Sequence, residues 1–153
     1  PCVFRNATGG AIALAALEMA LAGIRFPIPA DEVIDTMGEI GRSMELTARF
    51  PEYRFETTVA PVQRPEGVPG NVSYLTPEEI AETASWLKEA TGSHRQPYLL
   101  RFFNPQAHSD DRFRSVERLA PNALFRYRTA ARKYQVLTEI ETSSAGPHAR
   151  FLL

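Results

Sequence analysis

The sequence predicts an α/β fold: a partial (β/α) barrel or a parallel sheet with crossover helices, on which N-terminal helices pack. Residues 53–60 and 96–103 are rich in β-branched and aromatic residues and predict strands, and residues 75–79 open an amphipathic helix between them. Two strands joined by a helix run parallel through a right-handed crossover. Because ligands of α/β proteins bind at the carboxyl ends of such strands, we expect function near residues 60–61 and 103–104.

The helix between these strands has clear start and stop signals. Thr76, Pro77 and Glu79 are an N-cap, a first-turn proline and the third position of a capping box, and Gly92 is an expected left-handed terminator. The preceding connection, residues 61–74, is longer than the ~2–6 residues of most strand-to-helix loops. We therefore expect this connection to cover a site or bind a partner.

The N-terminal part predicts helices. Residues 11–22 (AIALAALEMALA) are too short for a membrane span of ~20 apolar residues, and no secretory signal is recognisable, so we expect a buried helix there. A connector with two prolines follows, and helical spacing resumes from about residue 30 to 48. We divide the chain into residues 1–29 (apolar helix and connector), residues 30–141 (α/β domain) and residues 142–153 (flexible tail).

The C-terminal part predicts a further helix over residues 123–134 and a strand over residues 135–141. The order after residue 50 is therefore β, α, β, α, β, which is typical of parallel strands. Three such strands leave two sheet edges and one face to cover. The N-terminal helices, another copy of the chain or a missing N-terminal half must cover them.

Composition limits the function classes. Seventeen basic and eighteen acidic side chains give a net charge of −1, so neither nucleic acid nor a membrane is favoured as a partner. Residues 126–134 interleave bases and aromatics, but a solvated helix flank explains them better than a nucleic-acid helix. The single cysteine, Cys2, permits no disulfide within the chain and favours a cytoplasmic location.

No complete catalytic or metal-binding motif is present. The three histidines, His94, His108 and His148, lack the spacing of HExxH or HxH, and surface positions explain them best. His108 with Asp110 and Asp111 follows the second strand, which leaves a metal or acid–base role open. We assign no catalytic residue and no metal ligand.

Arg101 stands out because it is a charged residue inside the apolar strand YLLRFF. A buried charge needs a partner or an exposed end. Arg101 faces either a ligand carboxylate or phosphate, or Glu56 on the neighbouring strand in a structural ion pair. The sequence leaves both readings open.

Four segments, PEYRFETTVAP, LTPEEIAETASWLKEATG, PYLLRFFNP and ALFRYRTAARKYQVLTEIE, together resemble the later part of radical S-adenosylmethionine (radical SAM) activating enzymes. The likeness covers roughly residues 31–141 and is greatest to the activating proteins of anaerobic ribonucleoside-triphosphate reductase. It implies an anaerobic oxidoreductase whose partner is a glycyl radical enzyme such as anaerobic ribonucleotide reductase. The CxxxCxxC motif that binds the family's iron–sulfur cluster is absent here, so the resemblance implies a cluster only in a longer parent protein.

The resemblance also implies which residues bind S-adenosylmethionine. Thr58 matches a cofactor-contacting strand, and Leu100, Arg101, Phe103 and Asn104 match the last barrel strand. The leading hypothesis is therefore the C-terminal portion of a glycyl-radical-enzyme activase, which contributes adenosyl-facing strands and a partner surface. The alternative is a non-catalytic α/β binding or interaction module.

Overall fold

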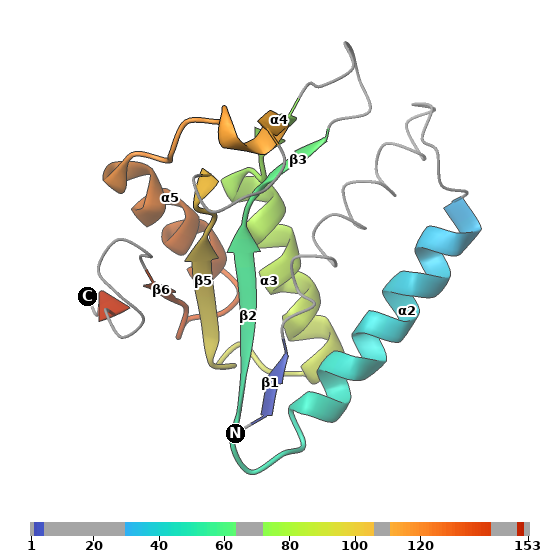
Figure 1. Ribbon diagram of the computed structural model, residues 1–153. Helices are drawn as coiled ribbons and strands as arrows, with labels where there is room; N and C mark the ends of the chain where they lie inside the picture. Colours follow the sequence, from blue (N-terminus) through green and yellow to red (C-terminus); the bar gives the residue numbers. More distant parts are fainter. Residues whose placement is uncertain (1, 5–29, 64–71, 106–110, 142–149, 152–153) are drawn as a thin grey trace.

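We describe the protein from a computed structural model, in which residues 2–4, 30–63, 72–105, 111–141 and 150–151 are described (Figure 1). The helices are α2 (Ala30–Thr47), α3 (Pro77–Thr91), α4 (Asp111–Arg114) and α5 (Pro121–Arg132). The strands are β1 (Cys2–Phe4), β2 (Tyr53–Val59), β3 (Pro61–Gln63), β4 (Val72–Tyr74), β5 (Tyr98–Phe102), β6 (Glu139–Glu141) and β7 (Arg150–Phe151).

Five of these strands form one sheet in the order β1-β2-β5-β6-β7. The first four are parallel, and β7 pairs with β6 in the antiparallel direction. The predicted α/β fold with parallel strands is thus confirmed. The sheet is open, since β1 and β7 lie at its edges, so it does not close into a barrel.

Helices α3 and α5 cover the same face of the sheet and lie behind it in the view of Figure 1. Alternate residues of β2 and β5 point toward them, because successive side chains of a strand face opposite sides. The core between these layers contains fully or nearly fully buried residues, namely Phe55, Val59, Ile80, Ala84, Leu87, Tyr98, Leu100, Tyr127, Ala131 and Ile140. The opposite face of the sheet therefore carries the other half of each strand's side chains.

Helix α3 begins and ends as its sequence predicts. The Thr76 hydroxyl accepts the backbone N–H of Glu79 at 3.1 Å, and Pro77 occupies the first helical turn. Gly92 has a φ of 71°, a left-handed backbone conformation that residues other than glycine rarely adopt. The cap and the terminator thus define both ends of α3.

The side chain of Gln135, which follows α5, is fully buried and links three elements. Its Oε1 accepts the backbone N–H of Gln96 at 2.9 Å, and its Nε2 donates to the carbonyl oxygens of Ser93 at 2.9 Å and Ala84 at 3.5 Å. These bonds hold the C-terminal end of α3, the approach to β5 and the turn after α5 together. The predicted strand over residues 135–141 consequently starts later, at Glu139.

Five short elements were not predicted. Cys2–Phe4 forms an edge strand within the part expected to be an apolar helix and connector, and Arg150–Phe151 forms a strand in the expected tail. The long connection after β2 contains the antiparallel pair β3–β4, and α4 follows β5. The expected helix at residues 11–22 lies outside the described residues, and the three-part division of the chain stays a prediction.

Helix α2 confirms the helical pattern expected from about residue 30, and it packs against α3 and β1 (Figure 1). Its Met44 is fully buried. A Cβ added to Gly41 would lie 3.6 Å from Nε1 of Trp86 on α3, which is ordinary contact. Within the described segments, no helix has both the length and the apolar character needed to cross a membrane.

Candidate functional site on the charged face of the sheet

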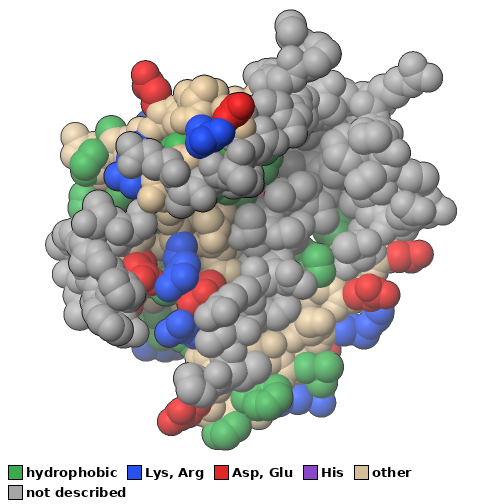
Figure 2. Space-filling model, viewed as in Figure 1, with side chains coloured by type: hydrophobic (Ala, Val, Ile, Leu, Met, Phe, Trp, Pro, Cys, Tyr) green, Lys and Arg blue, Asp and Glu red, His purple; other side chains and the backbone are tan. Residues whose placement is uncertain are grey.

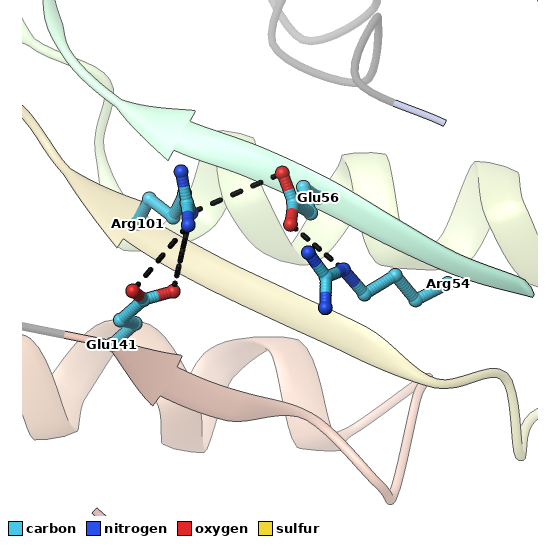
Figure 3. A network of polar contacts seen from close by, with 4 residues as sticks. All are labelled: Arg54, Glu56, Arg101 and Glu141. Atoms are coloured by element: carbon cyan, nitrogen blue, oxygen red, sulfur yellow. Dashed lines mark hydrogen bonds and ion pairs between the residues drawn. The ribbon is translucent and has the colours of Figure 1, made fainter. Parts of the chain in front are cut away.

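The sheet face opposite α3 and α5 carries a cluster of four charged side chains, which we call the charged face: Arg54, Glu56, Arg101 and Glu141 (Figure 3). They come from three adjacent parallel strands, β2, β5 and β6. The register places Thr58 opposite Arg101 and Arg101 opposite Glu141. Residues in register on parallel strands share a face, so strand pairing alone brings these groups together.

Ion pairs connect the four side chains. Arg54 Nε lies 2.8 Å from Glu56 Oε1, and Arg101 Nε lies 3.9 Å from Glu56 Oε2. Arg101 Nη2 lies 3.1 Å from Glu141 Oε2, and both the Nε and the Nη2 of Arg101 donate to that carboxylate. Glu56 is therefore flanked by two guanidinium groups, and Arg101 lies between two carboxylates.

The cluster is partly buried, and its basic groups reach solvent furthest. The side chain of Glu56 is 4% exposed and that of Glu141 13%, whereas those of Arg54 and Arg101 are 36% and 42% exposed. Figure 2, viewed from the same side as Figure 1, shows basic and acidic side chains next to one another over the sheet. Such a surface offers N–H donors to an anion beside carboxylates that accept from a cation.

The sequence left either a ligand anion or Glu56 as the partner of Arg101, and the structure shows ion pairs within the protein. Arg101 meets Glu56, as the structural alternative expected, and it is held more closely by Glu141. Arg54 and Glu141 were missed by sequence reasoning. The signal for Arg54 was the period-two pattern Arg54-x-Glu56-x-Thr58, which places polar residues on one face of a strand whose other face is apolar.

The structure does not bring all five predicted site residues together. Thr58 and Arg101 lie in register on the charged face. Leu100 is fully buried in the core on the opposite face, below α3 and α5. Ligand binding by the five residues stays a prediction; they are Thr58, Leu100, Arg101, Phe103 and Asn104.

Phe103 and Asn104 lie at the carboxyl end of β5. The Phe103 ring packs edge-on against Phe113, with ring centroids 6.4 Å apart, and its N–H donates to the carbonyl of Val59 at 3.0 Å. Arg118 Nη2 donates to Asn104 Oδ1 at 2.6 Å. This end of the sheet is thus tied to the segment between α4 and α5.

Tyr74 reaches the same segment as Asn104. Its hydroxyl donates to the carbonyl of Glu117 at 2.9 Å. Burial raises the pKa of Tyr74, and the nearby positive charge of Arg118 opposes that rise. The hairpin β3–β4 is therefore fixed to the segment after α4 at the carboxyl ends of the strands.

The metal or acid–base role left open for residues 108–111 stays a prediction, because His108 and Asp110 lie outside the described residues. In the part of the chain that the structure describes, no group of three or more histidine, cysteine, aspartate or glutamate residues is arranged to hold a metal ion. The described chemistry is that of paired guanidinium and carboxylate groups.

Comparison with known proteins gives matches to the N-terminal third. A sequence profile of the family described as "Serine dehydratase alpha chain" matches residues 1–50. The "Probable L-serine dehydratase, alpha chain" of Bacillus subtilis is 55% identical over 49 residues, 32% of this chain and 16% of that protein. The "L-serine dehydratase, alpha chain" of Peptoniphilus asaccharolyticus is 50% identical over 44 residues, 29% of this chain and 15% of that protein.

A third relative, the "Probable L-serine dehydratase, alpha chain" of Latilactobacillus sakei, is 51% identical over 49 residues, 32% of this chain and 23% of that protein. The region of this chain that matches covers less than a quarter of the length of each of these relatives. No solved structure matches the chain.

These matches contradict the resemblance to radical SAM activating enzymes. The assignments that rested on it are wrong: the glycyl-radical activase function, S-adenosylmethionine as cofactor, and a glycyl radical enzyme as partner. The resemblance depended on the order and spacing of strands and helices and on no catalytic motif. Such an order is common to many α/β proteins, so it identifies a fold class more reliably than a chemistry.

Proposed function

We propose that this chain contributes to an L-serine dehydratase, with residues 1–50 in the role that the matching segment has in the alpha chains of that enzyme. The observation that carries the proposal is the 50–55% identity to three relatives over 44–49 residues. The chemistry would be the removal of water from L-serine. The word "alpha" in the relatives' names indicates a second kind of chain, which we propose as the partner.

The way the matched segment packs supports this proposal. Its described parts are β1 and α2. Strand β1 pairs with β2 along three residues, from Cys2 opposite Tyr53 to Phe4 opposite Phe55, and α2 packs on α3 and β1. The described parts of the segment shared with the alpha chains thus join the same sheet and core as the rest of the described chain.

The charged face is also suited to such a substrate. L-serine is a zwitterion at neutral pH, with a carboxylate, an ammonium group and a hydroxyl. Arg101 and Arg54 offer N–H groups to a carboxylate, and Glu141 beside Arg101 offers oxygens to an ammonium group. We propose Arg101 and Thr58 as ligand-facing residues on this basis, and a cytoplasmic location as part of the same proposal.

A chimera tests the proposal directly. Residues 1–50 of this chain replace the matching segment in the Peptoniphilus asaccharolyticus alpha chain, and the complete enzyme is assembled with its remaining parts. Loss of water from L-serine gives an enamine that hydrolyses to pyruvate and ammonia, so pyruvate release is measured. We expect the chimera to retain L-serine-dependent pyruvate release.

The matched control replaces the same segment by residues 77–126 of this chain, which include α3 and lie outside the family match. We expect this control to be inactive. Loss of activity in a 1–50 chimera that assembles normally would show that the segment has another role and would contradict the proposal.

A further inference from the structure

A second site lies on the far side of α3 and α5 from the charged face. A groove of about 350 Å³ runs between the first turn of α3 and the outer surface of α5. Its lining residues are Pro77, Glu78, Phe125, Arg126, Thr129, Ala130 and Lys133. This volume is at the lower end of the range of ~300–1,000 Å³ that is typical of small-molecule sites.

The charge of the groove is set by α5. From Pro121 to Lys133 this helix carries four basic side chains, Arg126, Arg128, Arg132 and Lys133, and no acidic one, in a chain whose net charge is −1. Arg126 and Lys133 line the groove and face one acid, Glu78. Two cations against one carboxylate leave an excess of one positive charge, so the groove favours an anion.

An aromatic ring forms part of the same lining. Phe125 is 37% exposed, which is unusual for a phenylalanine, and the guanidinium carbon of Arg128 lies 5.2 Å from its ring centroid. Nε and Nη1 of Arg128 are buried and make no hydrogen bond among the described residues, and the Phe125 ring is a cation–π contact of this guanidinium group. The exposed ring presents a flat apolar surface on the helix that carries Arg126.

We propose that this groove binds a small organic anion that carries a flat ring, with the ring on Phe125 and the anionic group on Arg126 and Lys133. The Thr129 hydroxyl supplies a further hydrogen-bonding group. Ligands of this chemistry include nucleoside monophosphates and aromatic carboxylates. The groove lies outside residues 1–50, so this site does not depend on the proposed dehydratase function.

Titration of the ¹⁵N-labelled chain tests the site, with adenosine monophosphate, benzoate, adenosine and inorganic phosphate as separate probes. We expect adenosine monophosphate or benzoate to shift the amide signals of Phe125, Arg126 and Thr129. Adenosine and phosphate alone, each lacking one half of the chemistry, should bind at least about tenfold more weakly. Whichever of the first two probes binds more tightly identifies the source of the anion.

Variants separate this site from general surface charge. Arg126→Ala and Phe125→Ala should each weaken binding about tenfold, because each removes one of the two contacts. Lys88→Ala is the matched control, since Lys88 is exposed on α3 outside the groove, and its binding should be unchanged. Equal binding by Arg126→Ala and the parent chain, or shifts confined to other elements, would overturn the proposal.

Discussion

Arg101 on β5 and Glu141 on β6 lie opposite each other in the parallel ladder, and their side chains form an ion pair of 3.1 Å on the face of the sheet away from α3 and α5. Glu56 on β2 holds the same guanidinium group from the other side, at 3.9 Å. The orientation of Arg101 is thus fixed by two strands that are far apart in the sequence. Any ligand on this face meets an arginine whose direction is already set.

The buried carboxylate of Glu56 should matter more for stability than an exposed one. We expect Glu56→Gln to lower the free energy of unfolding by about 1–3 kcal/mol, because it leaves two partly buried guanidinium groups without their shared counter-ion. Glu45→Gln is the control, since Glu45 pairs with Arg49 at 2.8 Å on the exposed surface of α2. That change should cost no more than about 0.5 kcal/mol in the same urea titration.

The three hydrogen bonds of Gln135 make it a sensitive position. Replacement by leucine keeps the volume but leaves the buried N–H of Gln96 and the partly buried carbonyl of Ser93 without these partners. We expect Gln135→Leu to destabilise the protein by about 2–4 kcal/mol and to speed amide exchange at Gln96. Val136→Ala, at a neighbouring position that is 41% exposed, should change the unfolding midpoint little; similar losses for both variants would contradict this account.

Two glycines should respond in opposite ways to alanine. At Gly92, φ is 71° and alanine is strained whatever the available space, so Gly92→Ala should cost about 1 kcal/mol. Gly38 lies within α2, and among the described residues its added Cβ would meet only Arg42 Nη1, at 3.8 Å, so Gly38→Ala should stabilise by about 0.5–1 kcal/mol. Thermal unfolding of both variants checks the signs, and a gain at Gly92 would exclude the left-handed helix end.

Tyr127 should make stability depend on alkaline pH. Burial raises the pKa of its phenol to about 12, with the negative charge of Glu79 as a further cause, and its hydroxyl donates to the carbonyl of Leu75 at 2.6 Å. The folded-state pKa lies above the unfolded value of about 10. The contribution is therefore complete below pH 10 and is lost as the pH rises toward about 12.

Tyr127→Phe should remove this part of the alkaline loss and lower stability at neutral pH. Unfolding titrations at a series of pH values, with phenolate absorbance as a second readout, measure both effects. An unchanged alkaline slope in the variant would mean that another group is responsible.

Local rules predicted the helices and the parallel strands of this fold well. The start of α3 at Thr76 and its end at Gly92 depend on neighbouring residues, so the sequence shows them directly. Cys2–Phe4 and Arg150–Phe151 were missed because a strand of two or three residues forms only when another strand pairs with it. Such pairing is a property of the tertiary structure.

The candidate site was predicted in part for a similar reason. Arg101 was recognisable because a charge interrupts an apolar strand, and Glu56 was named as its alternative partner. Glu141 was missed because its position beside Arg101 depends on the register between β5 and β6, which no local pattern specifies. The family resemblance failed because shared element order carries no information about chemistry.

The pairing of β1 with β2 has a consequence for synthesis on the ribosome. Cys2 lies opposite Tyr53, so β1 is made 51 residues before the segment that pairs with it. At a synthesis rate of roughly 5–20 residues per second, about 3–10 s pass before β1 can form its hydrogen bonds with β2. During that interval residues 2–4 of the nascent chain lack the segment with which they pair in the folded protein, so β1 forms only after residues 53–55 have been made.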